Sequence, residues 1–254
     1  MQLRLILCAL AVSLFCLQAS AADRVVSLNL CTDQMLVLLA PEKVVGLSSL
    51  ARDPAISFVA AQAEHLPVVR ASAEAVLRRH PDLVLAAHYG AQTTLALLEQ
   101  EGITVRRLAL PQDFVGIRAQ TQELAAVLGV PQRGEALLAA MDTALDAPPH
   151  PSRSVRALVW EPRGLTAGPG TLMDAVLRAA GLANASDGRR VSLEALLRDP
   201  PDLLLVPAAP EFPALATEML DHPALAALRR REVPAALTIC AGPFTARAVA
   251  LLAQ

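Results

Sequence analysis

The chain has 254 residues, of which 54% are hydrophobic and 3% aromatic, and its formal net charge at pH 7 is −2. This charge excludes the broad positive field with which proteins attract nucleic acid. The length suits one large domain or two lobes of about 100 residues each.

The first 22 residues have the pattern of an export signal. Met1–Arg4 carries a positive charge, Leu5–Leu17 is an apolar run, and small residues follow as far as Ala22. Such a run is too short to span a bilayer comfortably, so we expect a cleaved signal peptide and a soluble protein in the periplasm. Lipidation is not expected, because the bulky Phe15 precedes Cys16 where processing needs a small residue.

Two cysteines, Cys31 and Cys240, remain after this cleavage. An oxidising compartment favours a disulfide between them, but sequence alone does not bring their Cα atoms within bonding range. A disulfide and a pair of free, half-buried thiols therefore both stay open at this stage.

Short β-type runs alternate with amphipathic stretches through the first half of the chain. Gly102 and Gly129 follow two of these stretches and are typical helix caps. This alternation predicts an α/β fold with a parallel sheet covered on both faces. The expected strands are Arg24–Asn29, Val44–Leu47, Leu83–Ala87 and Thr104–Leu108, and the expected helices are Asp33–Leu39, Thr93–Gln100 and Phe114–Leu128.

A helix at Gly134–Leu145 and a proline-rich loop separate this half from a second series of elements. We expect lobes at residues 23–130 and 153–254, a link at 131–152, and a last helix that returns to the first lobe. The second lobe is expected to contain strands at Ala157–Glu161, Leu203–Pro207 and Ala236–Cys240, and helices at Leu172–Ala180, Leu193–Leu197, Leu215–Leu220, Ala224–Arg231 and Phe244–Leu252.

An internal repeat supports this division. Residues 72–85 recur at 192–205, and nine of the 14 positions are identical. In each copy a serine caps a short helix, a glutamate lies in its first turn, and Pro-Asp leads into a buried strand. The repeat predicts two similar α/β lobes.

Two lobes create a cleft, and ligands approach parallel sheets at the carboxyl ends of their strands. Tyr89 and Trp160, the only tyrosine and tryptophan, both follow or end expected strands and offer aromatic surface; core packing is the alternative. Arg52 and Arg163 lie in such loops and could pair with carboxylates or phosphates of a ligand, although an arginine on a solvated surface is the more common case. The candidate ligand-binding residues are Cys31, Thr32, Arg52, Arg70, His88, Tyr89, Trp160, Arg163 and Phe244.

The sequence lacks the signals of a bare metal site or an enzyme. Of five histidines, only His88 lies at a promising strand end, so any metal should arrive as a preassembled chelate and no cofactor is expected. G-x-S-x-G, H-E-x-x-H and a G-x-G-x-x-G following a strand are all missing. A thiol dyad of Cys31 and His88 remains an alternative, as does an exported sensor or scaffold.

The opening RVVSLNLCTDQMLVLLAPEKVVGLSS and the doubled S-x-E-A-[VL]-L…P-D-L-[VL]-L resemble the periplasmic binding proteins for cobalamin and ferric siderophores. The resemblance implies two Rossmann-like lobes with central parallel sheets, joined by a single long helix that permits only small opening motions. It implies a monomer that captures an iron or cobalt chelate (ferric siderophore, cobalamin or heme) and delivers it to the membrane permease of an ABC importer.

The same resemblance gives roles to three residues. Glu74 and Glu194 match the glutamates with which each lobe meets arginines of the permease; stabilising a helix dipole is the alternative role. Arg70 stands near a position where the cobalamin binders carry an aromatic residue. This departure favours an anionic chelate over cobalamin.

Overall fold

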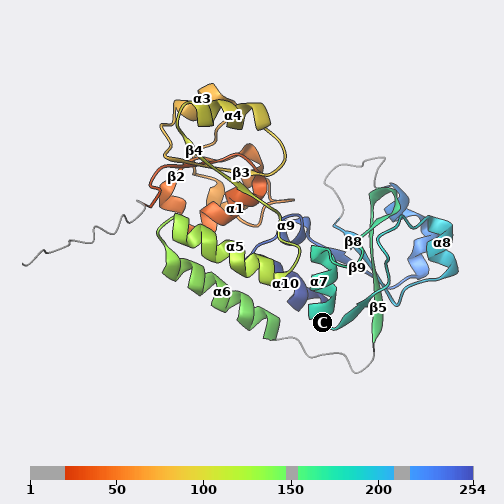
Figure 1. Cartoon of the computed structure of the whole chain (residues 1–254). Coiled ribbons are helices and arrows are strands. Elements are labelled where there is room, and N and C mark those ends of the chain that lie inside the picture. Colours follow the sequence, from red (N-terminus) through yellow and green to blue (C-terminus); the bar gives the residue numbers. More distant parts are fainter. Residues whose placement is uncertain (1–20, 147–153, 209–217, 254) are drawn as a thin grey trace, which may run out of the picture.

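Helix α6 (Pro131–Asp146) runs beneath one α/β lobe and leads toward a second (Figure 1). The computed structural model describes residues 21–146, 154–208 and 218–253. Residues 1–20, which hold most of the expected signal peptide, lie outside this part, as does the proline-rich loop at 147–153. Among the described residues, no helix has both the length and the apolar character needed to cross a membrane.

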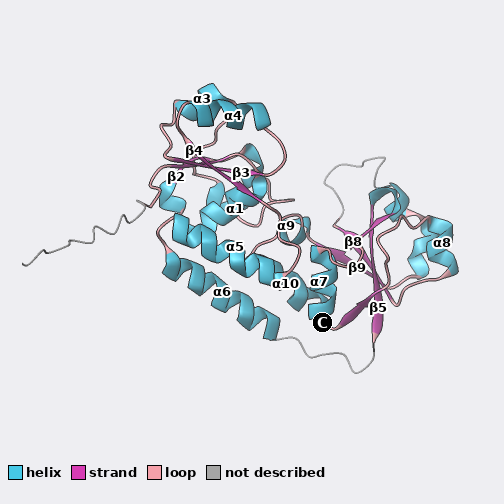
Figure 2. Cartoon of the chain, in the orientation of Figure 1, coloured by secondary structure: helices cyan, strands magenta, loops and turns pink. Residues whose placement is uncertain are grey.

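The N-terminal lobe is built on a parallel sheet in the order β2-β1-β3-β4. Alternate residues of each strand face opposite sides, so Leu83 and Leu85 share one buried cluster with residues of α1 and α5, while Val84 and Ala86 share another with residues of α3 and α4. Figure 2 shows α1 and α5 on one side of this sheet and α3 and α4 on the other. The elements are β1 (Val25–Ser27), α1 (Leu30–Leu39), β2 (Val44–Gly46), α2 (Ala60–Ala63), α3 (Ala73–Leu77), β3 (Leu83–Ala87), α4 (Gln92–Gln100), β4 (Thr104–Leu108) and α5 (Phe114–Val127).

The C-terminal lobe repeats this plan with parallel strands in the order β7-β5-β8-β9, and β6 forms an antiparallel pair with the end of β5. Helices α7 and α10 cover one face of the sheet and α8 covers the other. The elements are β5 (Val155–Glu161), β6 (Leu165–Thr166), α7 (Leu172–Ala179), β7 (Leu182–Asn184), α8 (Leu193–Arg198), β8 (Leu203–Pro207), β9 (Arg230–Val233), α9 (Ala235–Thr238) and α10 (Ala246–Leu252).

The sequence repeat is also a structural repeat. Ser72 and Ser192 cap α3 and α8 through their side chains, and each helix leads into the central strand of its sheet. The carboxylates of Asp82 and Asp202 then accept hydrogen bonds from the backbone N–H groups of Arg24, just before β1, and of Arg156, the second residue of β5. The duplicated module therefore fixes the helix start and the strand pairing in the same way in both lobes.

Two expected elements near the C-terminus were wrong. Ala224–Arg231 was expected to be one helix, whereas a 3-10 helix spans only Pro223–Ala227 and the edge strand β9 follows it. Ala236–Cys240 was expected to be a strand, whereas the short helix α9 occupies the first part of this range. An edge strand tolerates charged side chains, and the Arg-Arg-Glu run of β9 resembled a helix surface. Part of the helix expected at Leu215–Leu220 lies outside the described residues; Glu218–Asp221 is a 3-10 helix.

The segment before the last helix joins the lobes. Cys240 forms a disulfide with Cys31 of α1. A short 3-10 helix at Pro243–Thr245 then contacts α5 and α6, and α10 packs against α6 and α7. The last helix therefore lies between α6 and the core of the C-terminal lobe, and the residues just before it reach the first lobe.

Candidate ligand-binding cleft

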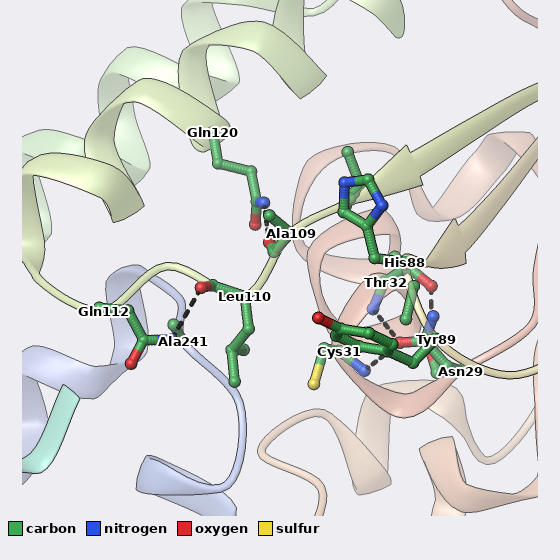
Figure 3. Close-up of a pocket in the computed structure, with 12 residues that line it drawn as sticks. Asn29, Cys31, Thr32, His88, Tyr89, Ala109, Leu110, Gln112, Gln120 and Ala241 are labelled. Atoms are coloured by element: carbon green, nitrogen blue, oxygen red, sulfur yellow. Dashed lines mark hydrogen bonds between the residues drawn. The ribbon is translucent and has the colours of Figure 1, made fainter. Parts of the chain in front are cut away.

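A cavity of about 400 Å³ lies where β1, β3 and β4 end (Figure 3). The N-terminal lobe supplies its walls, and one residue of the C-terminal segment, Ala241, joins them. The lining residues are Asn29, Cys31, Thr32, Ala87, His88, Tyr89, Leu108, Ala109, Leu110, Gln112, Gln120 and Ala241.

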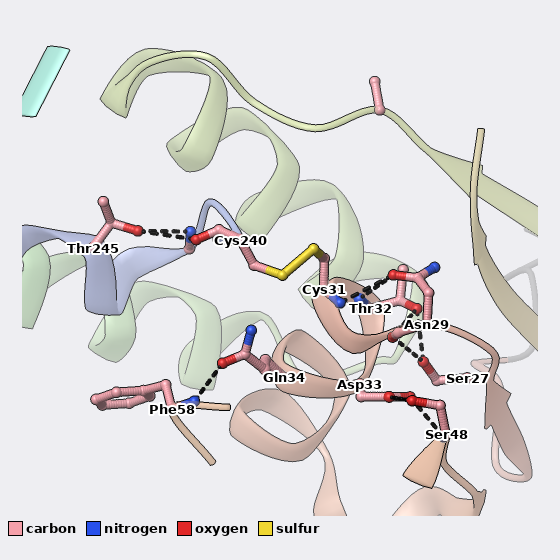
Figure 4. Close-up of a disulfide and its surroundings, with 12 residues drawn as sticks. Ser27, Asn29, Cys31, Thr32, Asp33, Gln34, Ser48, Phe58, Cys240 and Thr245 are labelled. Carbon is pink, nitrogen blue, oxygen red and sulfur yellow. Dashed lines mark hydrogen bonds between the residues drawn. A yellow bond between two sulfur atoms is a disulfide. The ribbon is translucent and has the colours of Figure 1, made fainter. Parts of the chain in front are cut away.

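The turn from β1 into α1 shapes one wall of this cavity. The Asn29 side-chain oxygen accepts hydrogen bonds from the backbone N–H groups of Cys31 (3.0 Å) and Thr32 (3.1 Å), which caps the helix (Figure 4). The Thr32 hydroxyl lies 2.7 Å from the hydroxyl of Ser27. These bonds hold Cys31 and Thr32 in a fixed position at the cavity.

The loop after β3 forms a second wall. The His88 N–H donates to the carbonyl of Leu108 (3.2 Å), and the Gln92 amide donates to the carbonyl of His88 (2.8 Å). Gly90 has φ of 87°, a left-handed conformation that favours glycine. The Tyr89 side chain is 91% exposed, so its ring is available to a ligand.

A second cavity of about 270 Å³ occupies the equivalent place on the C-terminal lobe, where β5, β8 and β9 end. Two of its lining residues, Thr238 and Ile239, immediately precede the disulfide and Ala241 of the first cavity. Its lining residues are Val159, Glu161, Met173, Leu205, Val206, Pro207, Val233, Ala235, Thr238 and Ile239. We call the two cavities together the cleft.

The described lining of the cleft is mostly apolar and includes one carboxylate and one histidine, His88. The cavity on the N-terminal lobe has no lysine, arginine, aspartate or glutamate among its described lining residues. Glu161 is the one such residue in the cavity on the C-terminal lobe. The described residues also hold no group of three or more His, Cys, Asp or Glu side chains that could bind a bare metal ion.

Comparison with known proteins identifies the family. A sequence profile described as periplasmic binding protein matches residues 25–233. The chain belongs to this family. Comparison with curated protein sequences found no match.

Solved structures of periplasmic binding proteins share the whole fold. A periplasmic heme-binding protein from Roseiflexus sp. RS-1 is 27% identical, with a TM-score of 0.71 over 92% of this chain and 97% of its own. A periplasmic heme-binding protein from Pseudomonas aeruginosa is 26% identical, with a TM-score of 0.70 over 91% of each chain. The heme-binding protein HutB of Vibrio cholerae, at 18% identity and a TM-score of 0.74 over 91% of this chain and 97% of its own, shares the fold. These neighbours are binding proteins, not enzymes.

Four of the expected ligand-binding residues line the cavity on the N-terminal lobe: Cys31, Thr32, His88 and Tyr89. The disulfide settles the open question about the cysteines, because Cys31 and Cys240 are bonded with their Cα atoms 5.2 Å apart. A bonded sulfur is not a nucleophile, so the dyad of Cys31 and His88 is excluded in this state.

Two expected aromatic contacts were wrong, because both side chains are buried. Trp160 is 0% exposed, and its indole N–H donates to the carbonyl of Val191 (2.9 Å) within the C-terminal lobe. Phe244 is 5% exposed and stacks on Phe58 with ring centroids 4.8 Å apart. Arg247 lies over the Phe58 ring, 4.7 Å from its centroid. Trp160 therefore stabilises a lobe core, and Phe244 stabilises the junction between the lobes.

None of the three expected arginines lines the cleft. The Arg52 guanidinium donates to the carbonyls of Ala63 (3.3 Å) and Leu66 (2.6 Å), so it holds a loop of its own lobe. Arg163 lines a separate hollow of about 370 Å³ on the C-terminal lobe. Arg70 is exposed and lines neither cavity, so it gives no support to an anionic ligand.

A buried acid that the sequence pattern did not predict lies next to the site. Asp33, in the first turn of α1, is 0% exposed, and burial raises its pKa to about 7. Hydrogen bonds from Ser48, through its hydroxyl (2.5 Å) and its N–H (3.3 Å), act in the opposite direction. The position of Asp33 in the first turn of a helix could have pointed to it. An exposed aspartate that stabilises the helix dipole, however, occurs at the same position and gives the same sequence pattern.

Proposed function

We propose that this protein is the substrate-binding subunit of an ABC importer, that it works in the periplasm, and that it holds a metal chelate in the cleft. The observation that carries the proposal is the apolar cavity at the strand ends, with the exposed Tyr89 ring on its wall. Cavities of this size and lining are typical of small-molecule sites. Solved relatives at 26% and 27% identity are heme-binding proteins, which supports a chelate as the ligand class.

A chelate with a large apolar surface suits this lining better than a highly charged one. Ferric citrate presents several carboxylates, and the described lining offers no lysine or arginine to pair with them. A tetrapyrrole or a neutral ferric hydroxamate instead presents carbon surface to Leu108, Leu110 and the Tyr89 ring. We therefore favour these two classes over ferric citrate.

Titration of the purified protein with hemin, cyanocobalamin, ferrichrome and ferric citrate tests the proposal. We expect saturable binding of at least one of the first three, with a dissociation constant at or below about 1 μM, and weaker binding of ferric citrate. Native mass spectrometry of protein isolated from its own periplasm should show the same ligand class. Failure of the first three probes to bind would overturn the proposal.

The proposed contact with the permease uses Glu74 and Glu194. The two glutamates occupy the same position of the structural repeat, one in the first turn of α3 and one in that of α8. The Glu74 side chain is 79% exposed and pairs with Arg78 (2.8 Å). Glu194 is exposed, and a hydrogen bond from Ser192 lowers its pKa. Both carboxylates are therefore accessible charges, one on each lobe.

Charge reversal separates docking from a dipole effect. The double variant Glu74→Arg, Glu194→Arg should abolish ligand uptake in cells while the affinity for ligand stays unchanged, because neither residue lines the cleft. The matched control is Glu232→Arg, an exposed glutamate on β9 outside the repeat. Uptake by the double variant equal to that of the control would remove the docking role.

A further inference from the structure

Glu161 is the last residue of β5 and brings the only carboxylate to the described lining of the cleft. Its side chain is exposed, and it makes no hydrogen bond or ion pair with another described residue. A partner within the protein therefore does not account for this charge.

The surroundings of the cleft do not compensate for Glu161. No described lysine or arginine lines either cavity. Arg247, at the junction of the lobes, lies over the ring of Phe58, and Arg163 lines another hollow. A ligand in the cleft meets one carboxylate on the C-terminal side and no lysine, arginine or carboxylate among the described residues on the other.

We propose that Glu161 determines ligand specificity by rejecting chelates that direct carboxylates at the C-terminal lobe. This inference rests on the proposed function and deepens it. Two carboxylates brought together in a partly desolvated cleft repel one another, whereas a carboxylate accepts strong hydrogen bonds from amide N–H groups. The preferred ligand is thus a neutral chelate with hydrogen-bond donors on its rim, such as an amide-bearing corrinoid. Selection of this kind works through a repulsive contact against the wrong ligand.

Hemin and hemin dimethyl ester make a direct test, because they share ring and iron and differ only in two carboxylates. Each ligand is added, in the same dilute detergent, to the wild-type protein, to Glu161→Gln and to the control Glu232→Gln. The control removes the same charge from β9 outside the cleft lining. We expect the wild type to bind the ester about tenfold more tightly than hemin. Glu161→Gln should raise hemin affinity about five- to tenfold and leave ester affinity unchanged, while Glu232→Gln should behave as wild type.

Two further measurements sharpen the result. The preference for the ester should decrease with added salt, because screening weakens repulsion between charges that solvent reaches. Cyanocobalamin, which carries amides, should bind Glu161→Gln a few-fold more weakly than wild type. The exposed position of Glu161 leaves the fold intact, and an unchanged thermal midpoint verifies this.

The inference is overturned if hemin and its ester bind the wild type equally, or if Glu161→Gln changes both affinities by the same factor. Absence of binding by hemin, ester, ferrichrome and cyanocobalamin alike overturns the proposed function itself.

Discussion

Cys31 and Cys240 form a disulfide that joins the start of helix α1 to the segment before the last helix, 209 residues along the chain. Cys31 also lines the cavity on the N-terminal lobe. The bond therefore ties the C-terminal segment to the N-terminal lobe at the cleft itself. The chain passes between the lobes through the region of α6, so the disulfide is a second covalent connection, and it limits how far the cleft opens at this point.

Removal of this disulfide should destabilise the protein. The double variant Cys31→Ser, Cys240→Ser is expected to lose about 2–5 kcal/mol of unfolding free energy, because its unfolded chain is no longer cross-linked. Urea unfolding measures the loss. A reductant should lower the wild-type midpoint toward that of the variant and leave the variant unchanged; equal midpoints without reductant would contradict the prediction.

The stacked pair of Phe58 and Phe244 should contribute to the same junction. A double-mutant cycle with Phe58→Ala and Phe244→Ala is expected to give a coupling energy of about 0.5–1.5 kcal/mol, the usual range for aromatic pairs. Urea unfolding of the four proteins provides the values. A matched cycle between Phe58 and the distant, buried Trp160 should give a coupling near zero.

Asp33 should make stability depend on pH. Burial raises its pKa from 3.8 to about 7, so the native state keeps a proton that the unfolded chain loses between these values. The contribution of Asp33 to the unfolding free energy is therefore largest below pH 3.8 and decreases as the pH rises toward 7. Wild type should lose stability between pH 5 and pH 8, whereas Asp33→Asn has no proton to lose at this position. The unfolding free energy of Asp33→Asn should therefore rise by about 2–3 kcal/mol relative to that of wild type over this range, since one pKa unit corresponds to about 1.4 kcal/mol.

Urea unfolding at pH 5, 6, 7 and 8 measures this difference. Asp53→Asn, on the exposed loop that follows Ser48, is the matched control and should keep the wild-type pH dependence. Parallel pH profiles for wild type and Asp33→Asn would show that the Asp33 proton is not retained on folding.

Tyr89 should contribute to affinity but not to stability. Tyr89→Ala is expected to weaken binding of the tightest chelate about tenfold, since it removes an aromatic contact, and to leave the thermal midpoint unchanged because the ring is 91% exposed. Tyr89→Phe keeps the ring and distinguishes stacking from a role of the hydroxyl. Unchanged affinity in Tyr89→Ala would remove this residue from the site.

Strands that follow a turn signal in the sequence could be predicted. The bounds of β3, β4 and β8 match their expected ranges, and α4 begins one residue early. Strand β9 was missed because its two arginines and glutamate hid the strand pattern, and no glycine or proline separates it from the preceding run at 224–229. The edge strand β4 also carries two arginines, but Gly102 marks the end of the helix before it, and its bounds were predicted.

The site residues that directly follow a strand could be predicted from the sequence. His88 and Tyr89 follow β3 directly, and both line the cavity. Asn29, Gln112 and Gln120 were missed, although Asn29 has the residue type and position of a helix cap. Burial of Trp160 depends on how its lobe packs, and no run of neighbouring residues reveals it.

Trp160 has a practical consequence for fluorescence measurements. It is the only tryptophan, and it lies sealed inside the C-terminal lobe. A ligand in the cavity beside Tyr89 cannot touch its ring. A coloured chelate will dim the emission through energy transfer across space, and a colourless one will leave it bright. A shift of the emission to longer wavelength on heating will report the exposure of Trp160 to water, and so the loss of packing around it.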